Sequence, residues 1–387
     1  MNPLTLQVMD ITSLKAVVTD LRQIIIPSRF EKAQQPEPGT IQIALRTLRG
    51  LIWIELSWTA EAPRLVQISS PIRIGSESTL AQQVQHGLNN LALVDIKQNG
   101  FERIVMFYLA KRPGAPIERT LVIEIMGRYS NFLLLENQEK IITLGRQVSN
   151  KQSRVRPIGT GDAYVPPPAL QGKEPNSTET FEKWKNRLTL VPCKLKKALQ
   201  DTYQGISPAI ALQLASDTFE EANKLLGLNV SEIKEIQWIT LYKRWIYWLK
   251  CLENESLEIS FDGPTDFKLW SKHFNEKRNS KKLSLILGKY YREKLELKKL
   301  GILTKELEKR ILKMKLNEES HLQKQEELLK KILENKSIQQ QADALLCLPS
   351  PDRQLINQAQ KLYERAKKLR RSKPIIKERI FYHEKRI

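Results

Sequence analysis

Residues that could catalyse a reaction or bind a metal are scattered along this sequence without a recognisable spacing. The four histidines, His86, His273, His321 and His383, lie far from one another and from the three cysteines. This distribution does not fit the closely spaced ligand pairs of zinc sites. No GxxxxGK[ST] or GxGxxG loop is present to hold a nucleotide, and nothing singles out a Ser/His/Asp triad. We therefore expect no catalytic residue, no metal and no cofactor, and a protein that is not an enzyme.

A polar cluster interrupts two apolar runs in residues 124–137, EIMGRYSNFLLLEN. The run before it alternates like a strand, and the run after it is continuously apolar, like a buried strand. Gly127, Ser130 and Asn131 therefore predict a tight turn, where Gly127 permits a backbone conformation or a close approach that a Cβ would block.

Arg128 lies in this turn, and its guanidinium can pair with phosphate or carboxylate through two parallel hydrogen bonds. Two interpretations stay open. Arg128 contacts a nucleic acid, or it forms a buried ion pair with Glu124 or Glu102 that fixes two strands.

Basic residues are in excess, with a net charge of +20 over 387 residues. Residues 271–387 hold 31 Lys and Arg against 15 Asp and Glu, which is +16 of that excess. A surface of this kind is typical of a protein that binds a phosphate-rich partner, although a solvated helical face is the alternative.

The apolar runs are much shorter than a membrane span, and the first residues lack the basic start of a signal peptide. Cys193, Cys251 and Cys347 form no CxxC pair. We therefore expect a reducing, cytoplasmic location without a membrane anchor.

Residues 1–168 are predicted to be mixed α/β. Ser13 is expected to cap a short helix through Leu21, and a second helix is expected over 79–89. Strands are expected near 41–45, 51–56, 65–68, 93–96 and 104–109, followed by those on either side of the polar turn. Pro166 to Pro168 then stop regular structure, which indicates a domain boundary near 170.

Residues 181–250 are predicted to be helical. Gly205-Ile206-Ser207-Pro208 forms a turn into a helix over 209–215, with Pro208 in the first helical turn. This turn is typical both of modules that present backbone amides to phosphate and of a simple αα-hairpin. Three tryptophans, Trp238, Trp245 and Trp248, are expected in the core.

From about Lys277 the composition predicts long helices. Apolar residues at heptad spacing form a seam, and polar residues interrupt it; the apolar members are Leu300, Leu307, Ile311, Met314, Leu328 and Ile332, and the polar ones Glu318, His321 and Gln325. Pro349 and Pro351 break the helix, and a returning helix over 355–369 would complete a basic antiparallel hairpin. Pro374 to Ile387 are expected to begin a further helix at most.

Several motifs resemble the NFACT family of ribosome quality control factors. Glu124 to Asn131, EIMGRYSN, resembles the family signature EIMGRHSN, with Tyr129 in place of histidine. Gly100-Phe101-Glu102-Arg103-Ile104 resembles its GxDRI element, with Glu102 in place of aspartate. The start of the first helix at Asp10, the proline-rich loop from Arg156 to Pro167 and the Gly205 to Pro208 turn resemble further family elements in the same order.

The resemblance implies a factor that binds a stalled large ribosomal subunit holding peptidyl-tRNA and recruits alanyl-tRNA for alanine tailing. It implies tRNA-binding roles for Glu102, Arg103 and Arg128. It also implies motif or structural roles for Glu124, Met126, Gly127, Ser130, Asn131, Gly205, Ser207 and Pro208.

The implied fold class is α+β, in three domains. Residues 1–175 would form an α/β domain similar to the amino-terminal domain of formamidopyrimidine-type DNA glycosylases. Residues 176–270 would form a small helix-hairpin-helix-like domain, and residues 271–387 an incomplete coiled-coil arm. Family members continue into a carboxy-terminal RNA-binding domain, which we expect to be absent here or encoded separately.

Three alternatives remain. Some family members carry the name of fibronectin-binding proteins, so a surface adhesin is one. A glycosylase-like protein that binds nucleic acid without catalysis is another, because Asn2 separates Pro3 from the initiator methionine. An arm-like scaffold without an RNA partner is the third.

Overall fold

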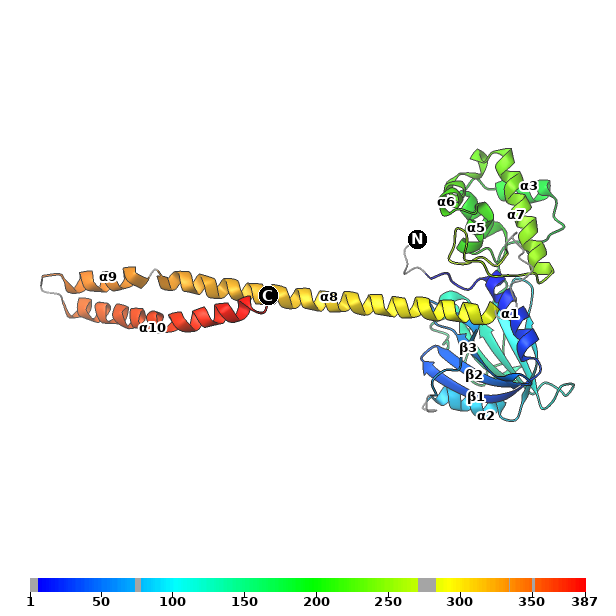
Figure 1. The fold of residues 1–387 in the computed structure, drawn as a ribbon, viewed down its shortest axis with the longest axis horizontal. Helices are drawn as coiled ribbons and strands as arrows, with labels where there is room; N and C mark the ends of the chain where they lie inside the picture. The colour runs from blue at the N-terminus through cyan, green and yellow to red at the C-terminus, as the bar shows by residue number, and fades with distance from the viewer. Residues whose placement is uncertain (1–5, 74–77, 271–282, 334, 350–351) are drawn as a thin grey trace. The chain divides into compact units, whose positions relative to one another are not determined.

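The computed structural model describes residues 6–73, 78–270, 283–333, 335–349 and 352–387. It divides into two compact units, Met1–Leu295 and Glu296–Ile387 (Figure 1). The described part of the first unit contains a β-sheet and a group of short helices, and that of the second unit is helical.

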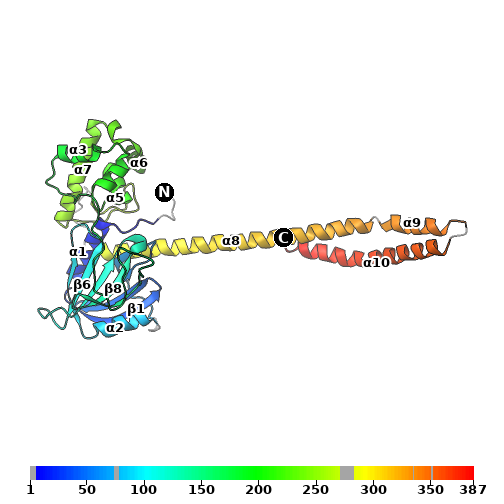
Figure 2. The same ribbon diagram turned by 180° about the vertical axis from the view of Figure 1, so that it is seen from behind.

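Among the described residues, the first unit contains one antiparallel sheet of nine strands, beside the group of helices α3 to α7 (Figures 1 and 2). The strands are β1 (Ser28–Glu37), β2 (Thr40–Thr47), β3 (Gly50–Ser57), β4 (Arg64–Ile68), β5 (Ala92–Gln98), β6 (Ile104–Ala110), β7 (Arg119–Glu124), β8 (Asn131–Glu136) and β9 (Lys140–Leu144). Their order across the sheet is β4-β3-β2-β1-β5-β6-β7-β8-β9. Each strand predicted from apolar alternation is present, and the mixed α/β prediction is confirmed.

Two strands, β1 and β9, were not predicted. The sequence of β1 is SRFEKAQQPE, whose glutamines, charged residues and proline hide the apolar alternation. It nevertheless lies inside the sheet, between β2 and β5. Gln34 is buried there and donates from Nε2 to Gln42 Oε1 at 2.9 Å, so a cross-strand amide pair replaces an apolar contact.

Two helices cover the sheet, α1 (Ile11–Ile25) and α2 (Thr79–Leu88). Asp10, rather than Ser13, caps α1, and its Oδ1 accepts from the backbone N–H of Ser13 at 2.9 Å. The prediction of Ser13 as the cap was therefore wrong by three residues. Aspartate is as good a cap as serine, and the apolar face of α1 already begins at Ile11.

The sheet curls, so that residues distant in its strand order meet. Trp58, which follows β3, stacks on Phe132 of β8 with ring centroids 5.4 Å apart. Gly145, after β9, leaves room for this indole, because a Cβ there would overlap the ring. α2 contacts both β1 and β9 and so covers strands that are not neighbours.

The helices α3 to α7 form a second core in the first unit. They are α3 (Phe181–Thr189), α4 (Leu195–Thr202), α5 (Pro208–Ala215), α6 (Phe219–Gly227) and α7 (Glu235–Glu253). Trp184 of α3 packs edge-on against Trp238 of α7, and Trp245 packs against Trp248 at 5.4 Å. The prediction that the α7 tryptophans belong to the core is confirmed.

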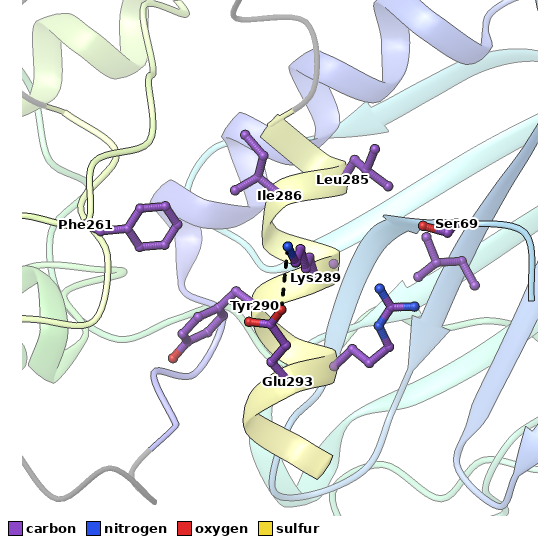
Figure 3. A pocket seen from close by; sticks show the side chains of 10 residues that line it. Ser69, Phe261, Leu285, Ile286, Lys289, Tyr290 and Glu293 are labelled. Atoms are coloured by element: carbon purple, nitrogen blue, oxygen red, sulfur yellow. Dashed lines mark ion pairs between the residues drawn. The ribbon is translucent and has the colours of Figure 1, made fainter. Parts of the chain in front are cut away.

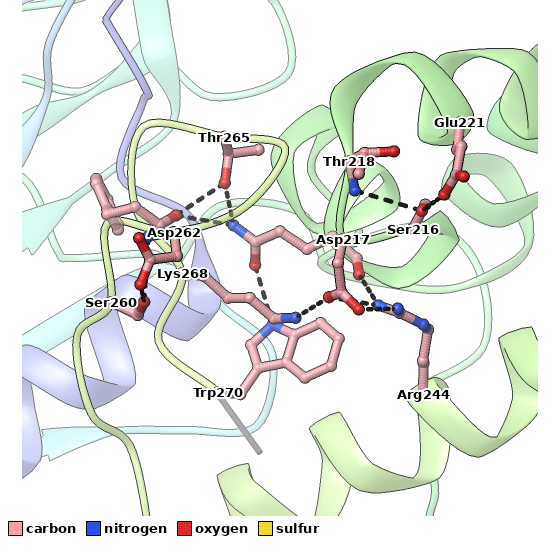
Figure 4. Close-up of polar contacts among 12 residues, drawn as sticks. Ser216, Asp217, Thr218, Glu221, Arg244, Ser260, Asp262, Thr265, Lys268 and Trp270 are labelled. Carbon is pink, nitrogen blue, oxygen red and sulfur yellow. Dashed lines mark hydrogen bonds and ion pairs between the residues drawn. The ribbon is translucent and has the colours of Figure 1, made fainter. Parts of the chain in front are cut away.

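A polar cluster joins these helices to the chain that follows α7 (Figure 4). Asp217 forms ion pairs with Arg244 and with Lys268, whose Nζ lies 3.1 Å from Asp217 Oδ1. Hydrogen bonds from Arg244 and then Lys268 lower the pKa of the Asp217 carboxyl to about 2. Trp270 Nε1 donates to the side-chain oxygen of Gln213 at 3.0 Å. Gln213 is buried, so this bond also fixes the segment after α7 on α5. We call these five residues the Asp217 latch.

The helix α8 (Leu283–Leu333) begins in the core of the first unit (Figure 3). Ser284 donates from its backbone N–H and its hydroxyl to Asp20 Oδ2 of α1, at 2.7 and 2.5 Å. Gly288 lies against β4, because a Cβ there would overlap the carbonyl of Gln67. A cavity of about 570 Å³ lies beside this contact and is lined by Ile68, Phe261 and the first turns of α8. The predicted arm start near Lys277 lies outside the described residues.

In the second unit the rest of α8, α9 (Asn335–Leu346) and α10 (Arg353–Glu384) form a helical hairpin (Figure 1). α10 packs on α9 and returns along α8, where His383 Nδ1 lies 2.6 Å from Glu318 Oε2. The polar seam residue Glu318 is therefore paired across the hairpin. Leu300, Leu307, Ile311 and Met314 of the predicted seam are exposed, whereas Ile332 is buried.

The prediction that Pro374 to Ile387 begin a further helix at most was wrong, because α10 continues through Pro374 to Glu384. Proline lacks the N–H that would bond to the carbonyl of Arg370, four residues earlier. Arg370 is exposed, so water can bond to this carbonyl. Ala366 and Ile376 are buried on either side of the proline, and this packing keeps the helix continuous. Pro351, one of the predicted breaks, lies outside the described residues.

Candidate functional site

The Glu102-Arg103 pair lies in the loop between β5 and β6, and Gln98 at the end of β5 shapes this loop. Gln98 Nε2 donates to the carbonyls of Asn99, Gly100 and Glu102 at 3.1, 3.0 and 2.7 Å. Gly100 adopts φ +53°, a conformation that side chains rarely adopt. One amide group therefore holds a tight loop that ends at the predicted charged pair.

Arg103 is half-buried near two carboxylates. Burial lowers the pKa of its guanidinium, whereas the negative charges of Asp10 and Glu102 raise it. Arginine stays protonated in proteins. The two carboxylates therefore stabilise the positive charge of Arg103, which is partly shielded from water. Glu102 in turn accepts from the backbone N–H of Leu170 at 3.1 Å, which fixes its carboxylate.

Asp10 links the starts of two helices. Its Oδ1 caps α1, and its Oδ2 accepts from the hydroxyl of Ser207 at 3.0 Å. Ser207 also caps α5, because its Oγ accepts from the N–H of Ile210 at 3.0 Å. The positive ends of both helix dipoles therefore meet the Asp10 carboxylate, next to Arg103.

Gly205 brings the α4–α5 turn close to this junction. It adopts φ +76°, and a Cβ at this position would lie 3.1 Å from Phe101 Cδ1 and 3.2 Å from Ile11 Cγ2. The turn therefore needs glycine for its backbone conformation and for its approach to the β5–β6 loop.

Lys15 adds a second cation to the junction. Its Nζ lies 4.8 Å from the centroid of the Phe101 ring, which is within cation–π range. Burial lowers the pKa of Lys15, and the carboxylates of Glu174, Glu253 and Glu255 oppose this shift. In addition, Trp248 Nε1 donates to Thr12 Oγ1 at 2.9 Å and joins α7 to α1.

The EIMGRYSN motif forms the predicted turn, a short 3-10 helix over Gly127–Tyr129 between β7 and β8. Gly127 adopts φ +58°, and the N–H of Met126 donates to Ser130 Oγ at 2.8 Å. The N–H of Ile125 donates to the carbonyl of Arg103 at 2.9 Å. The EIMGRYSN turn and the Glu102-Arg103 loop are thus adjacent through their backbones.

Arg128 does not form the buried ion pair that was one of its two interpretations. Glu124 is buried, and Arg156 occupies its carboxylate through two bonds of 2.9 and 2.6 Å. Tyr164 donates a further hydrogen bond to it at 3.1 Å. Arg128 is exposed, and its guanidinium lies over the Tyr129 ring at 4.7 Å. Arg156 comes from the loop after β9 and reaches the end of β7, whereas Arg128 lies within the turn and is exposed at the surface.

The structure thus gathers Glu102, Arg103, Gly205 and Ser207 at one junction and presents Arg128 on a neighbouring turn. The sequence interpretation missed Asp10 and Lys15 as members of this junction. Asp10 had a detectable signal as a helix cap, since an aspartate directly before an apolar periodic run favours the N-cap position. The sequence around Lys15 gave no such signal, because the residues that surround its side chain come from distant segments.

The described ranges contain no group of three His, Cys, Asp or Glu side chains suited to hold a metal ion. Within the same ranges, no helix is both long enough and apolar enough to cross a bilayer.

Comparison with known proteins places these motifs in a family. The model of the NFACT N-terminal and middle domains matches residues 10–350. The Rqc2 homolog RqcH of Streptococcus suis is 28% identical over 207 residues, which cover 52% of this chain and 37% of that protein. RqcH of Bacillus subtilis is 31% identical over 119 residues, which cover 30% and 21%. The matched regions thus span well under two thirds of these relatives.

Two solved structures share the fold. The N-terminal part of the fibronectin/fibrinogen-binding protein from Streptococcus suis aligns with a TM-score of 0.53 and 21% identity, over 74% of this chain and 99% of that one. The fibrinogen binding protein from Staphylococcus aureus aligns with a TM-score of 0.51 and 20% identity, over 70% and 92%. Because the family model covers most of its length, the protein belongs to the NFACT family.

Proposed function

We propose that this protein is a ribosome quality control factor in the cytoplasm. It binds a stalled large ribosomal subunit with its peptidyl-tRNA and recruits alanyl-tRNA for carboxy-terminal alanine tailing. Relatives named RqcH and the ordered family motifs support this proposal. The protein acts by binding and positioning RNA, and the chemistry of peptide transfer belongs to the ribosome.

Arg103 carries the proposal for tRNA. The negative charges of Asp10 and Glu102 act on its guanidinium, and the loop that holds it is fixed by Gln98. A half-buried guanidinium on a fixed loop can present its planar N–H donors to a phosphate. The acidic residues nearby disfavour nonspecific contact with the RNA backbone.

The helical hairpin carries the proposal for rRNA. α10 exposes a run of basic side chains, Arg365, Lys367, Lys368, Arg370 and Arg371. Closely spaced positive charges on an exposed helix bind phosphates and release their counterions. We propose that the hairpin is the coiled-coil arm that contacts the large subunit. We also propose that the α/β domain shares the glycosylase-like fold without glycosylase activity.

Two assays on the same variants test the proposal, co-sedimentation with purified large subunits and binding of labelled tRNA. Arg103→Ala should weaken tRNA binding about tenfold or more, as expected for loss of a charge-assisted phosphate contact, and should leave subunit binding nearly unchanged. Arg103→Lys should recover only part of the tRNA affinity, because lysine cannot make a bidentate contact. Arg46→Ala removes an exposed arginine that also pairs with a carboxylate, and it is the matched control.

Two results would contradict the proposal. Absence of any association with large subunits at low salt would exclude the ribosomal role. An equal loss of tRNA and subunit binding in Arg103→Ala, together with a lower melting temperature, would show that Arg103 only stabilises the fold.

A further inference from the structure

We propose that Arg128 and Tyr129 form a stacking platform for an unpaired RNA base. We call this pair the Arg128–Tyr129 platform. The proposal rests on the proposed RNA-binding function and adds the kind of RNA structure that this part of the protein recognises. It assigns a role to the position where this chain carries tyrosine in the EIMGRYSN motif.

Tyr129 is a large aromatic side chain left open to solvent, with 66% of its surface exposed. The Arg128 guanidinium lies 4.7 Å from its ring centroid and donates from Nη2 to the phenol oxygen at 2.6 Å. The two planar groups therefore hold each other in place without burying the platform. Exposed tyrosine rings and guanidinium planes are the groups on which proteins stack unpaired bases.

The turn beneath the platform is built to be rigid. Ser130 and Asn131 are buried, and both side chains bond to backbone groups. Ser130 Oγ accepts from Met126 N at 2.8 Å, and Asn131 Oδ1 accepts from the N–H groups of Phe132 and Arg146 at 2.9 Å each. Two polar side chains are thus buried to fix a turn whose outer residues pack against nothing in the core. Such pre-organisation lowers the entropy lost when a ligand binds.

Positive charge lies next to the platform. Arg146 is exposed, and its guanidinium donates to the carbonyl of Arg128 at 2.6 Å, which places it beside the turn. The segment 146–156 contains three further basic residues, Lys151, Arg154 and Arg156, and no acidic one. Arg156 is committed to Glu124, but the others are exposed. A nucleotide stacked on Tyr129 would therefore have its phosphates close to Arg146.

An unpaired base fits this arrangement better than a duplex. Bases inside an RNA helix are stacked on their neighbours and do not offer a free face to a side chain. The platform presents one ring and one guanidinium at the tip of a turn, so it can take a single base. A single-stranded end, a loop or a bulge supplies such a base.

Fluorescence anisotropy with the full chain tests the platform, using a labelled oligoadenylate and a labelled blunt-ended RNA duplex. Tyr129→Leu should weaken oligoadenylate binding about tenfold, the loss typical of one stacked base. It should change duplex binding by less than about twofold, because phosphate contacts are retained. Tyr129→Phe should keep the affinity, since it keeps the ring. Phe219→Leu removes another partly exposed ring and is the matched control.

The outcomes separate the platform from the proposed function. If Tyr129→Leu binds oligoadenylate as tightly as the wild type, or loses both RNAs equally, the platform is wrong while RNA binding stands. If the wild type binds neither RNA and does not associate with large subunits, the proposed function is wrong and the platform with it.

Discussion

At the scale of single residues, two glycines with left-handed backbones show two different reasons why a position requires glycine. One reason is the backbone conformation, and the other is the space that a side chain would need. Gly205 and Gly127 have φ of +76° and +58°. A Cβ on Gly205 would press on Phe101 and Ile11, whereas a Cβ on Gly127 has nothing within 4 Å. Both positions need glycine for the backbone, but only Gly205 needs it for space.

We therefore expect Gly205→Ala to destabilise the protein by more than Gly127→Ala. The left-handed conformation costs about 1–2 kcal/mol for a residue with a Cβ, and close contact at Gly205 adds roughly 1–3 kcal/mol. Urea unfolding of the two variants measures the difference. Equal losses would mean that the α4–α5 turn moves away from the β5–β6 loop without penalty.

The Arg156–Glu124 pair shows how a residue's role depends on its partner. A buried carboxylate at Glu124 needs a cation, and two arginines of neighbouring motifs could supply it. Arg156 supplies it, so Arg128 stays free of this ion pair. The exposed arginine is then available for a ligand, which is the condition on which the platform depends.

At the scale of elements, the Asp217 latch holds the segment after α7 on the helices α5 to α7. The folded-state pKa of Asp217 is about 2, below the value of about 3.9 for an unfolded chain. Because the folded protein binds the proton less tightly, the latch contributes its full stability above about pH 4 and loses it as the pH falls towards 2. The Asp217 side chain is 68% exposed, so water screens the pairs and the contribution is about 1 kcal/mol or less.

This predicts that Asp217→Asn lowers the free energy of unfolding near pH 6 by up to about 1 kcal/mol and has little effect near pH 2. Urea unfolding at several pH values measures this trend. Glu220→Gln, an exposed change on the next helix that also removes one negative charge, is the control. A loss that stays constant with pH would assign the stabilisation to hydrogen-bond geometry rather than to charge.

The hairpin of the second unit shows that packing between helices can keep a helix continuous through a proline. α10 passes Pro374 because Ala366 and Ile376 are buried on the hairpin. A local rule predicts a helix end at such a proline, and tertiary packing outweighs it.

At the scale of the whole molecule, a net charge of +20 predicts binding to RNA that depends steeply on salt. We expect Arg370→Ala with Arg371→Ala in α10 to weaken binding to large subunits and to reduce the slope of log affinity against log salt by about 2. Lys196→Ala with Lys197→Ala removes the same charge from an exposed part of α4 and is the control. Equal slopes for the two double variants would show that net charge, and not α10, drives the association.

Local patterns in the sequence were sufficient to predict most of the elements and the turn. Apolar alternation predicted the strands from β2 to β7, and a continuous apolar run predicted β8. Glycine with small polar residues predicted the turn over Gly127–Tyr129. These features depend on neighbouring residues, because steric limits on the backbone and side-chain periodicity act over a few positions. The family resemblance likewise required only ordered local motifs.

Tertiary structure alone decided which distant residues became partners. Ser207 bonds to Asp10 from 197 residues away, and Arg156 rather than Arg128 neutralises Glu124. The polar strand β1 lies inside the sheet because its neighbours satisfy its buried amides. Such pairings depend on how whole elements pack, and a buried charge or amide takes whichever partner that packing brings within hydrogen-bond distance.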